Sequence, residues 1–461
     1  MAGPIAVALF TRDLRAHDNP VLRAAAASGR VVPLFVVDEA ITGFCVPNRA
    51  RFLAESLADL DSSLRGLGAR LVIRRGRVVD EVPAMAREAG AATVHVAADV
   101  SSYAQHRLDA LGAALRRDGR ELCVHDAVVT AVAPGAVTPL GGDHFKVFTP
   151  YFVQWTKVPR REPLAPPSGL GMPDVRPGSL PSADELATGA PAPELMAGGE
   201  LEARRRLDAW SERADDYGDG HNMMANDATS RLSPYLHFGC VSATEVVHRV
   251  GTGTEGARAF VRQVAWRDFH HQVLAARPDA SRHDYRPRGD RWGHDEDELD
   301  AWRQGRTGFP IVDAAMRQLL REGWLHNRAR LIVASFLAKT LYIDWRVGAR
   351  HFLDHLVDGD VANNQMNWQW MAGTGTDTRP NRVLSTIAQA RRYDPDGRYV
   401  RRYVPELADV AGLEGPRVHE PWRLDAPARA TLDYPEPIIA PEDVTRRLRA
   451  ARGGNDSQTT G

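Results

Sequence analysis

Two hydrophobic periodicities divide the chain. Over residues 5 to about 130, short apolar runs alternate with amphipathic stretches of helical length, a pattern typical of parallel α/β sheets. The apolar runs occupy residues 5–10, 31–37, 70–73, 93–96 and 122–124. From about residue 200 to 450 the periodicity is helical. The pattern predicts a Rossmann-like α/β domain with a parallel sheet, followed by a larger all-α domain.

The domain boundaries follow from composition. The α/β domain is expected over residues 1–132, and the helical domain over residues 200–450. Residues 133–199 are rich in Pro and Gly and are expected to form a connector. Residues 451–461 are predicted to form a polar tail.

The overall composition narrows the class of protein. The chain has 461 residues, of which 43% are hydrophobic, so it can bury substantial cores. Its three cysteines, Cys45, Cys123 and Cys240, form no CxxC pair, and no apolar run suits a signal peptide or a membrane span. We therefore expect a cytoplasmic protein without membrane contact. We predict no metal site, because His351 and His355 have helical spacing but no third ligand.

The net charge of −1 carries no general signature of nucleic-acid binding, so any DNA affinity must come from a local patch. Residues 377–402 are the candidate, because arginines outnumber the three aspartates there. The arginines are Arg379, Arg382, Arg391, Arg392, Arg398, Arg401 and Arg402.

Residues 358–370 carry the most informative chemistry. Their sequence, DGDVANNQMNWQW, combines carboxylates, carboxamides and two tryptophans. Carboxylates and carboxamides can bind a polar heterocycle, while tryptophans provide stacking faces and easily oxidised rings. This combination predicts a redox cofactor beside a flat aromatic substrate.

Six other segments agree with this interpretation. They are Thr11–Asn19, Thr229–Tyr235, Trp266–Phe269, Phe309–Arg317, His326–Arg330 and His419–Trp422. In this order they closely resemble the photolyase/cryptochrome family over nearly the whole chain, and most of all its bacterial class I members, which repair cyclobutane pyrimidine dimers. The resemblance implies light-dependent repair, in which excited reduced flavin donates an electron to the dimer, the ring splits and the electron returns.

The resemblance also implies FAD, bound in a U shape in the helical domain. Asn364 matches the position facing flavin N5, where its carbonyl could accept the hydrogen of reduced flavin. Arg330 is expected to pair with Asp358. The other cofactor-binding residues implied are Tyr217, Thr229, Ser230, Arg231, Leu232, Ser233, Phe260, Gly359 and Asp360.

Two further sets of residues match functional positions of the family. Trp292, Trp345 and Trp368 match a chain of tryptophans that passes electrons to photoexcited flavin, and with Asn364 they are the catalytic candidates. Trp266 and Trp370 match aromatics that sandwich a flipped dimer in UV-damaged DNA. The other DNA- and lesion-binding candidates are Gln263, Arg267, Asn327, Arg328, Arg382 and Gln389.

Some positions depart from the family pattern and leave alternatives open. Gln263 stands where dimer-repairing relatives generally carry Glu. This departure and Ser385-Thr386, in place of the usual Asn-Pro, favour a cryptochrome-type blue-light receptor, whereas Asn364 disfavours it. A (6-4) photoproduct lyase is a second alternative, but such relatives carry His where Asn327 stands. His221 and Leu331 also depart from the pattern, and all these changes bear on binding strength and quantum yield.

An antenna chromophore is implied as well, bound by the α/β domain at its interface with the helices. Asp99-Val100 occupies a loop where folate-binding relatives tend to supply Glu. We therefore expect 8-hydroxy-5-deazaflavin, with methenyltetrahydrofolate as the alternative. A monomer is expected, because a reader of DNA lesions needs no two-fold symmetry.

Overall fold

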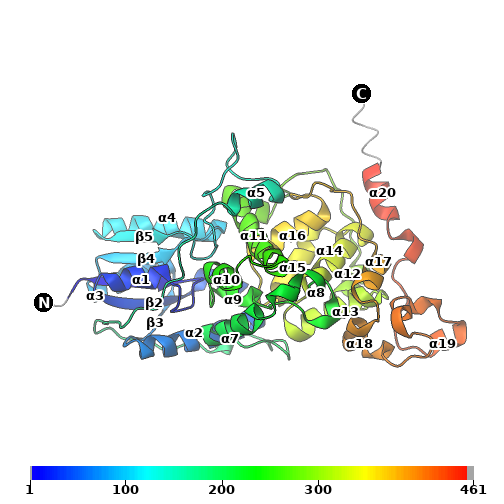
Figure 1. Cartoon of the computed structure of the whole chain (residues 1–461), viewed down its shortest axis with the longest axis horizontal. Helices are drawn as coiled ribbons and strands as arrows, with labels where there is room; N and C mark the ends of the chain where they lie inside the picture. Colours follow the sequence, from blue (N-terminus) through cyan, green and yellow to red (C-terminus); the bar gives the residue numbers. More distant parts are fainter. Residues whose placement is uncertain (1–2, 454–461) are drawn as a thin grey trace.

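The computed structural model describes residues 3–453 and forms two domains joined side by side along the long axis of the molecule (Figure 1). The N-terminal domain contains a five-stranded parallel sheet in the order β3-β2-β1-β4-β5. Its strands are β1 Ile5–Phe10, β2 Arg30–Asp38, β3 Val72–Gly76, β4 Thr93–Ala97 and β5 Glu121–His125. The predicted α/β class and all five predicted strands are confirmed.

Helices cover both faces of the sheet. Helices α3 (Val78–Ala89) and α4 (Ser102–Arg117) bury one face, and α1 (Pro20–Ala27) and α2 (Pro47–Gly66) bury the other. Because both faces of the central strands are buried, these strands are continuous apolar runs rather than alternating ones. These continuous apolar runs are the pattern from which the strands were predicted.

The strand order reverses between β1 and β4, whose carboxyl ends open toward the helical domain. In parallel sheets such a reversal leaves a crevice at the strand ends. Arg12 follows β1 and Asp99 follows β4, and the two form an ion pair of 3.1 Å in this crevice. Arg12 also pairs with Asp360 of the helical domain. The crevice is therefore part of the contact between the domains.

The predicted connector contains more structure than its composition indicated. Helix α5 (Phe148–Trp155) lies within it and packs against α11 of the helical domain, and α6 (Ala183–Leu186) follows. The ring of Phe148 stacks on Trp266 with centroids 3.7 Å apart and an angle of 7° between the planes. Burial of an aromatic cluster thus orders this part of the connector.

The remaining chain is helical, as predicted. No helix between residues 3 and 453 is both long and apolar enough to cross a membrane. Helix α20 extends past residue 450, and residues 454–461 of the predicted tail lie outside the described part. The helices are α7 Glu200–Ser211, α8 Tyr217–Gly220, α9 Ser233–Phe238, α10 Ala243–Val250, α11 Glu255–Ala276, α12 Glu296–Gln304, α13 Pro310–Glu322, α14 Asn327–Ser335, α15 Trp345–His355, α16 Val361–Ala372, α17 Thr386–Tyr393, α18 Arg398–Tyr403, α19 Ala426–Ala430 and α20 Arg446–Gly453.

Candidate functional site

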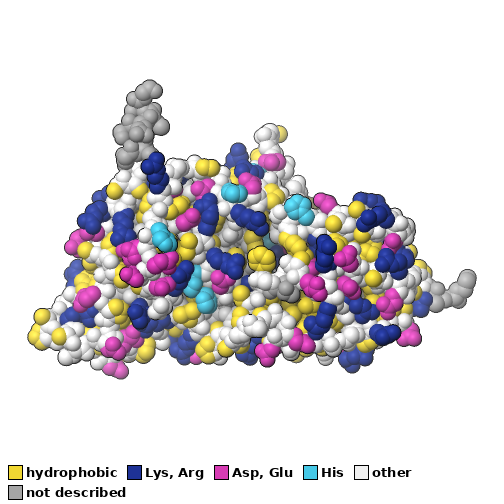
Figure 2. All heavy atoms as spheres, turned by 180° about the vertical axis from the view of Figure 1, so that it is seen from behind, with side chains coloured by type: hydrophobic (Ala, Val, Ile, Leu, Met, Phe, Trp, Pro, Cys, Tyr) yellow, Lys and Arg dark blue, Asp and Glu magenta, His cyan; other side chains and the backbone are white. Residues whose placement is uncertain are grey.

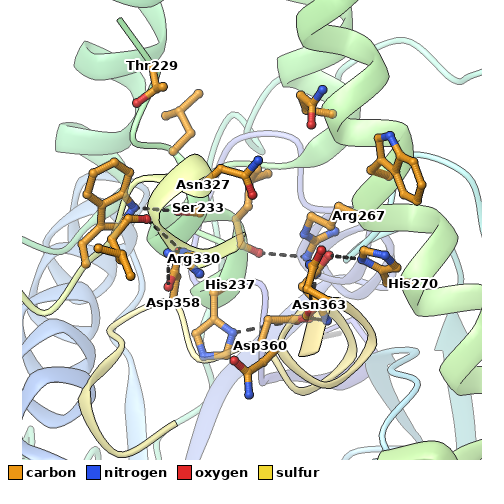
Figure 3. A pocket seen from close by; sticks show the side chains of 18 of the residues that line it. Thr229, Ser233, His237, Arg267, His270, Asn327, Arg330, Asp358, Asp360 and Asn363 are labelled. Carbon is orange, nitrogen blue, oxygen red and sulfur yellow. Dashed lines mark hydrogen bonds and ion pairs between the residues drawn. The ribbon is translucent and has the colours of Figure 1, made fainter. Parts of the chain in front are cut away.

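A cavity of about 430 Å³ lies in the helical domain and brings most of the predicted site residues together (Figure 3). We call it the candidate cavity. The segment before α9, the long helix α11, and helices α14 and α16 supply its walls. Of the predicted residues, it is lined by Tyr217, Thr229, Ser230, Arg231, Leu232, Ser233, Phe260, Gln263, Trp266, Arg267, Asn327, Arg330, Asp358, Asp360, Asn364, Trp368 and Trp370.

The expected ion pair between Arg330 and Asp358 is present at the wall of the cavity. Nη2 of Arg330 lies 2.7 Å and 3.0 Å from the two carboxylate oxygens of Asp358, whose side chain is buried. Nε of Arg330 donates to the carbonyl of Leu325 at 2.9 Å. A buried carboxylate needs such partners, and the pair fixes both side chains.

Asp360 connects the cavity to the α/β domain. Its side chain caps α16 by accepting the backbone N–H of Asn363 at 2.8 Å, and it also faces Arg12 and His271. Burial by itself raises the pKa of Asp360, but the charges of His271 and Arg12 outweigh burial and hold the pKa well below its usual range. Asp360 is therefore a carboxylate at neutral pH.

Asn364 presents one particular atom to a ligand. Its side-chain N–H groups donate to the carbonyl of Ala349 and to Oε1 of Gln365, both at 3.0 Å. Both donors of the amide are thus used within the protein. The carbonyl oxygen is left as the atom through which Asn364 can accept a hydrogen bond.

The segment from Thr229 to Ser233 offers polar atoms to a ligand. Oγ1 of Thr229 is buried and has no hydrogen-bond partner among residues 3–453. A buried hydroxyl without a partner is costly, so this atom fits a ligand acceptor or donor at the cavity wall. The guanidinium of Arg231, in contrast, binds Asp227 and Glu322 at 2.7 Å each and shapes the segment.

The lesion-binding candidates in the cavity combine aromatic faces with exposed carboxamides. Gln263 and Trp266 lie one turn apart on α11, and the stack with Phe148 fixes the ring of Trp266. Trp370 lies on α16, and the guanidinium carbon of Arg382 is 5.1 Å from its ring centroid. Asn327, at the start of α14, is exposed. The same cavity therefore offers stacking surfaces and hydrogen-bonding groups.

Six predicted residues do not line the cavity: Trp292, Trp345, Arg328, Gly359, Arg382 and Gln389. Gly359 packs against the α/β domain, where an added Cβ would lie 2.7 Å from Nη1 of Arg49. Arg328 donates to Asn222 at 2.7 Å and lies over the ring of Tyr393. Gln389 lies on α17, outside the lining. Because Gly359 has no side chain, Arg49 of the α/β domain can pack closely against it.

The guanidinium of Arg267 makes its hydrogen bonds within the protein. It was predicted to neutralise a DNA phosphate, but its side chain is largely buried. Its guanidinium donates to the backbone carbonyls of Val129 at 2.7 Å and Leu236 at 3.1 Å. These bonds join the segment after β5 to the helical domain. Arg267 therefore holds the two domains together, and its contact with DNA phosphate stays a prediction.

The three candidate tryptophans lie on three different segments. Trp368 of α16 is buried at the cavity wall, and its Nε1 has no partner within the described chain. Trp345 begins α15 and is fully buried, with Nε1 donating to Asp284 at 2.9 Å. Trp292 is half-buried in the segment before α12, with its ring centroid 4.9 Å from that of Tyr342.

A second polar group of the cavity was not among the predicted residues. His270 and Asn363 face each other across 3.0 Å, opposite the Arg330–Asp358 pair in Figure 3. Burial lowers the pKa of His270 to about 4, so the imidazole is neutral at pH 7. His270 follows Trp266 by four residues on α11. Helical periodicity therefore places both on one face, a signal that could have revealed it.

Two family models match this chain. Residues 6–168 match the model described as DNA photolyase, and residues 260–452 match the FAD binding domain of DNA photolyase. The chain belongs to the DNA photolyase family. Among curated photolyases, a deoxyribodipyrimidine photo-lyase of Streptomyces griseus is 58% identical over 456 residues, which cover 97% of this chain and 99% of the relative.

Solved structures include both photolyases and cryptochromes with this fold. A bacterial class III photolyase from Agrobacterium tumefaciens matches with a TM-score of 0.91 and 32% identity, covering 99% of this chain and 98% of that one. A cryptochrome from Synechocystis matches with a TM-score of 0.87 and 28% identity, covering 97% and 99%. The fold of the photolyase family is therefore shared by repair enzymes and cryptochromes, and site residues must separate the two functions.

Proposed function

We propose that this protein repairs UV-damaged DNA in the light by splitting cyclobutane pyrimidine dimers. The observation that carries the proposal is that one cavity is lined both by residues suited to FAD and by the aromatic residues Trp266 and Trp370. An electron donor and a dimer flipped out of the DNA would thus meet within one site.

The residues fit FAD in three ways. The hydroxyls of the segment from Thr229 to Ser233 suit its diphosphate, the Arg330–Asp358 pair suits the polar edge of the flavin ring, and Phe260 offers an apolar wall. Bound FAD supplies an electron donor that blue light excites. We assign the carbonyl oxygen of Asn364 as the acceptor for the hydrogen on flavin N5, because the N–H groups of this amide already have partners.

For the lesion, we propose that Trp370 and Trp266 stack against the flipped bases, while Gln263 and Asn327 bind their polar edges. Base stacking on an aromatic residue contributes about 1–3 kcal/mol per base. Arg382 lies beside Trp370 and is exposed, so it can neutralise a phosphate next to the stacked lesion. Figure 2 shows Lys and Arg interspersed with Asp and Glu over one face, in line with a net charge of −1.

We further propose that Trp368, Trp345 and Trp292 pass electrons inward to photoexcited, oxidised flavin and so prepare the enzyme for repair. The surroundings of the indole nitrogens support an outward path for the positive charge. Nε1 of Trp368 faces no acceptor within residues 3–453, whereas Nε1 of Trp345 donates to the Asp284 carboxylate. A positive charge is therefore better stabilised on Trp345 than on Trp368.

A blue-light receptor is the second candidate function, and Gln263 is the observation that favours it. This side chain lines the cavity as a neutral amide, so it offers the dimer neither a charge nor an acid. The (6-4) lyase alternative has less support, because Asn327 carries no imidazole. We also propose that the protein is a cytoplasmic monomer. Size-exclusion chromatography tests the oligomeric state and should give the mass of one chain.

For the antenna we propose 8-hydroxy-5-deazaflavin rather than methenyltetrahydrofolate. The side chain of Asp99 is buried against Arg12, so its carboxylate is already paired and does not provide the carboxylate expected of a folate site. Purified protein incubated with each chromophore separately should retain the deazaflavin after gel filtration. Retention of the folate alone would reverse this assignment.

The repair proposal is tested with photoreduced protein and three oligonucleotides, carrying one thymine cyclobutane dimer, one (6-4) photoproduct or no damage. We expect thymine absorbance to recover only for the dimer and only under blue light. Recovery with the (6-4) product alone would select that activity. No recovery, with bound FAD that photoreduces normally, would favour the receptor. Undamaged DNA controls for bleaching.

A further inference from the structure

The outermost tryptophan of the proposed electron chain contacts a tyrosine. The rings of Trp292 and Tyr342 lie 4.9 Å apart between centroids and are tilted by 40°. The backbone N–H of Gly293 donates to the carbonyl of Tyr342 at 2.8 Å, and Gly293 forms a bridge with Ile343. Backbone pairing therefore holds the two rings together.

Tyr342 occupies an unusual position in the backbone. It follows a π-helix, Phe336–Leu341, and has a φ of 59°, a left-handed conformation that is uncommon for an aromatic residue. Asp344 then caps α15, which begins at Trp345. One tight junction thus carries both Tyr342 and Trp345. Strained backbone and π-helical turns are frequent at functional sites.

The phenol of Tyr342 is paired with a buried carboxylate. Its hydroxyl donates to Oδ1 of Asp290 at 2.7 Å, and both side chains are buried. Arg452 of α20 binds the same carboxylate at 2.8 Å and 2.7 Å. Burial raises the pKa of Asp290, but hydrogen bonds from Arg452 and Tyr342 outweigh it and lower the pKa, so Asp290 is an anion at rest. Burial and Asp290 raise the pKa of Tyr342 to about 12, so the phenol keeps its proton.

We propose that Tyr342 is the terminal redox residue of the tryptophan chain, with Asp290 as its proton acceptor. This rests on the electron route under the proposed function, because Trp292 must first be oxidised. The Trp292 radical cation takes one electron from Tyr342, the phenolic O–H bond breaks, and the proton passes to Oδ1 of Asp290. The products are neutral Trp292, a neutral tyrosyl radical and protonated Asp290, so one electron and one proton move and charge is conserved.

The hydrogen bond from the Tyr342 hydroxyl to Asp290 gives the proton a direct path when the ring is oxidised. The guanidinium groups of Arg288 and Arg452 lie in this region, whereas burial lowers the pKa of the nearby Lys339 to about 7. The step leaves a neutral tyrosyl radical, while the proton neutralises Asp290 and weakens its ion pair with Arg452. Return of the electron from flavin would also require the proton to return from Asp290. The tyrosine therefore lengthens the lifetime of the separated charges.

The test uses full-length protein with oxidised FAD, flashed with blue light and followed by transient absorption and electron paramagnetic resonance. The wild type should form a tryptophan radical that converts to a neutral tyrosyl radical. Tyr342→Phe, which keeps the ring contact, should lose the tyrosyl signal and leave the charge on tryptophan. Asp290→Asn should slow tyrosyl formation on the order of 10²-fold, because a positioned proton acceptor is lost.

Tyr103→Phe is the matched control. Tyr103 lies on α4 of the α/β domain, its hydroxyl also donates to a carboxylate, that of Asp38, and its pKa is likewise raised to about 12. It should leave the radical kinetics unchanged. A wild-type trace with tryptophan radicals only, or a tyrosyl signal that survives Tyr342→Phe, would overturn the role of Tyr342 alone. Absence of any tryptophan radical would overturn the electron route itself, while failure of dimer repair with normal radicals would concern the repair function.

Discussion

Arg12 of the α/β domain forms an ion pair with Asp360, the residue that caps α16 in the helical domain. The same guanidinium donates to Asp99 at 3.1 Å and to the carbonyl of His237 at 3.0 Å. One side chain thus joins the end of β4, helix α9 and the start of α16. The α/β domain therefore takes part in shaping the candidate cavity, from outside its lining.

We predict that Arg12→Gln destabilises the protein by about 3–5 kcal/mol, the usual cost of leaving one partner of a buried ion pair alone. FAD should also dissociate more readily, because Asp360 lines the cavity. Urea denaturation and release of flavin fluorescence measure the two effects. The control is Arg51→Gln, whose pair with Glu55 is exposed and should contribute at most about 1 kcal/mol. Equal losses for both variants would contradict the coupling.

Acid should remove the contribution of Asp360 to the free energy of unfolding. Because the folded-state pKa of this carboxyl is depressed, its stabilisation is fully present above the unfolded value of about 4 and is lost as the pH falls through the folded value. The free energy of unfolding should therefore decline below about pH 4. In Asp360→Asn this part of the decline should be missing, and an unchanged pH profile would refute the assignment.

Asn364→Asp should lower the reduction potential of bound FAD. The change adds a negative charge beside the ring and removes the donors to Ala349 and Gln365. We expect a shift of at least about 30 mV, which is a tenfold change for a two-electron couple. Spectroelectrochemical titration measures it, with Asn226→Asp as a control because Asn226 pairs with Arg398 away from the lining. Equal reduction potentials of FAD in the two variants would contradict the proposed contact with N5.

Trp370→Ala should weaken binding of dimer-containing DNA by about 1–3 kcal/mol, the loss of one stacking surface. Binding of undamaged duplex should change little. Arg382→Ala should weaken binding of both DNAs and reduce the slope of log K against log salt by about 1, because it removes a phosphate contact. Fluorescence anisotropy over a salt series separates the two patterns, and identical patterns would argue against the assigned roles.

Trp292→Phe should slow flavin photoreduction, because phenylalanine is harder to oxidise than tryptophan. Repair by chemically pre-reduced enzyme should proceed at the wild-type rate, since that reaction does not use the chain. The rate of flavin photoreduction and the rate of dimer splitting by pre-reduced enzyme are measured in parallel. Loss of repair in the pre-reduced variant would remove Trp292 from the electron route.

The sequence predicted features that are local in the chain, but it did not predict hydrogen bonds and ion pairs between distant segments. The buried strands and the DGDVANNQMNWQW motif are continuous in the chain, so periodicity and residue type indicated the sheet and the wall formed by α16. The role of Arg267 depends instead on carbonyls of Val129 and Leu236, which only the folded chain brings near. Likewise, no local pattern connects Asp290 with Arg452. Ion pairs between distant segments arise from packing, so the sequence alone leaves them undetermined.

If the electron returns to the flavin after each light-driven repair, one protein molecule can split many dimers. The direct measurement is the number of dimers split per molecule of pre-reduced protein, without oxygen or added reductant, under continuous blue light. We predict that many dimers are split per protein molecule and none in darkness. At most one dimer split per molecule, or equal splitting in the dark, would contradict light-driven repair with return of the electron.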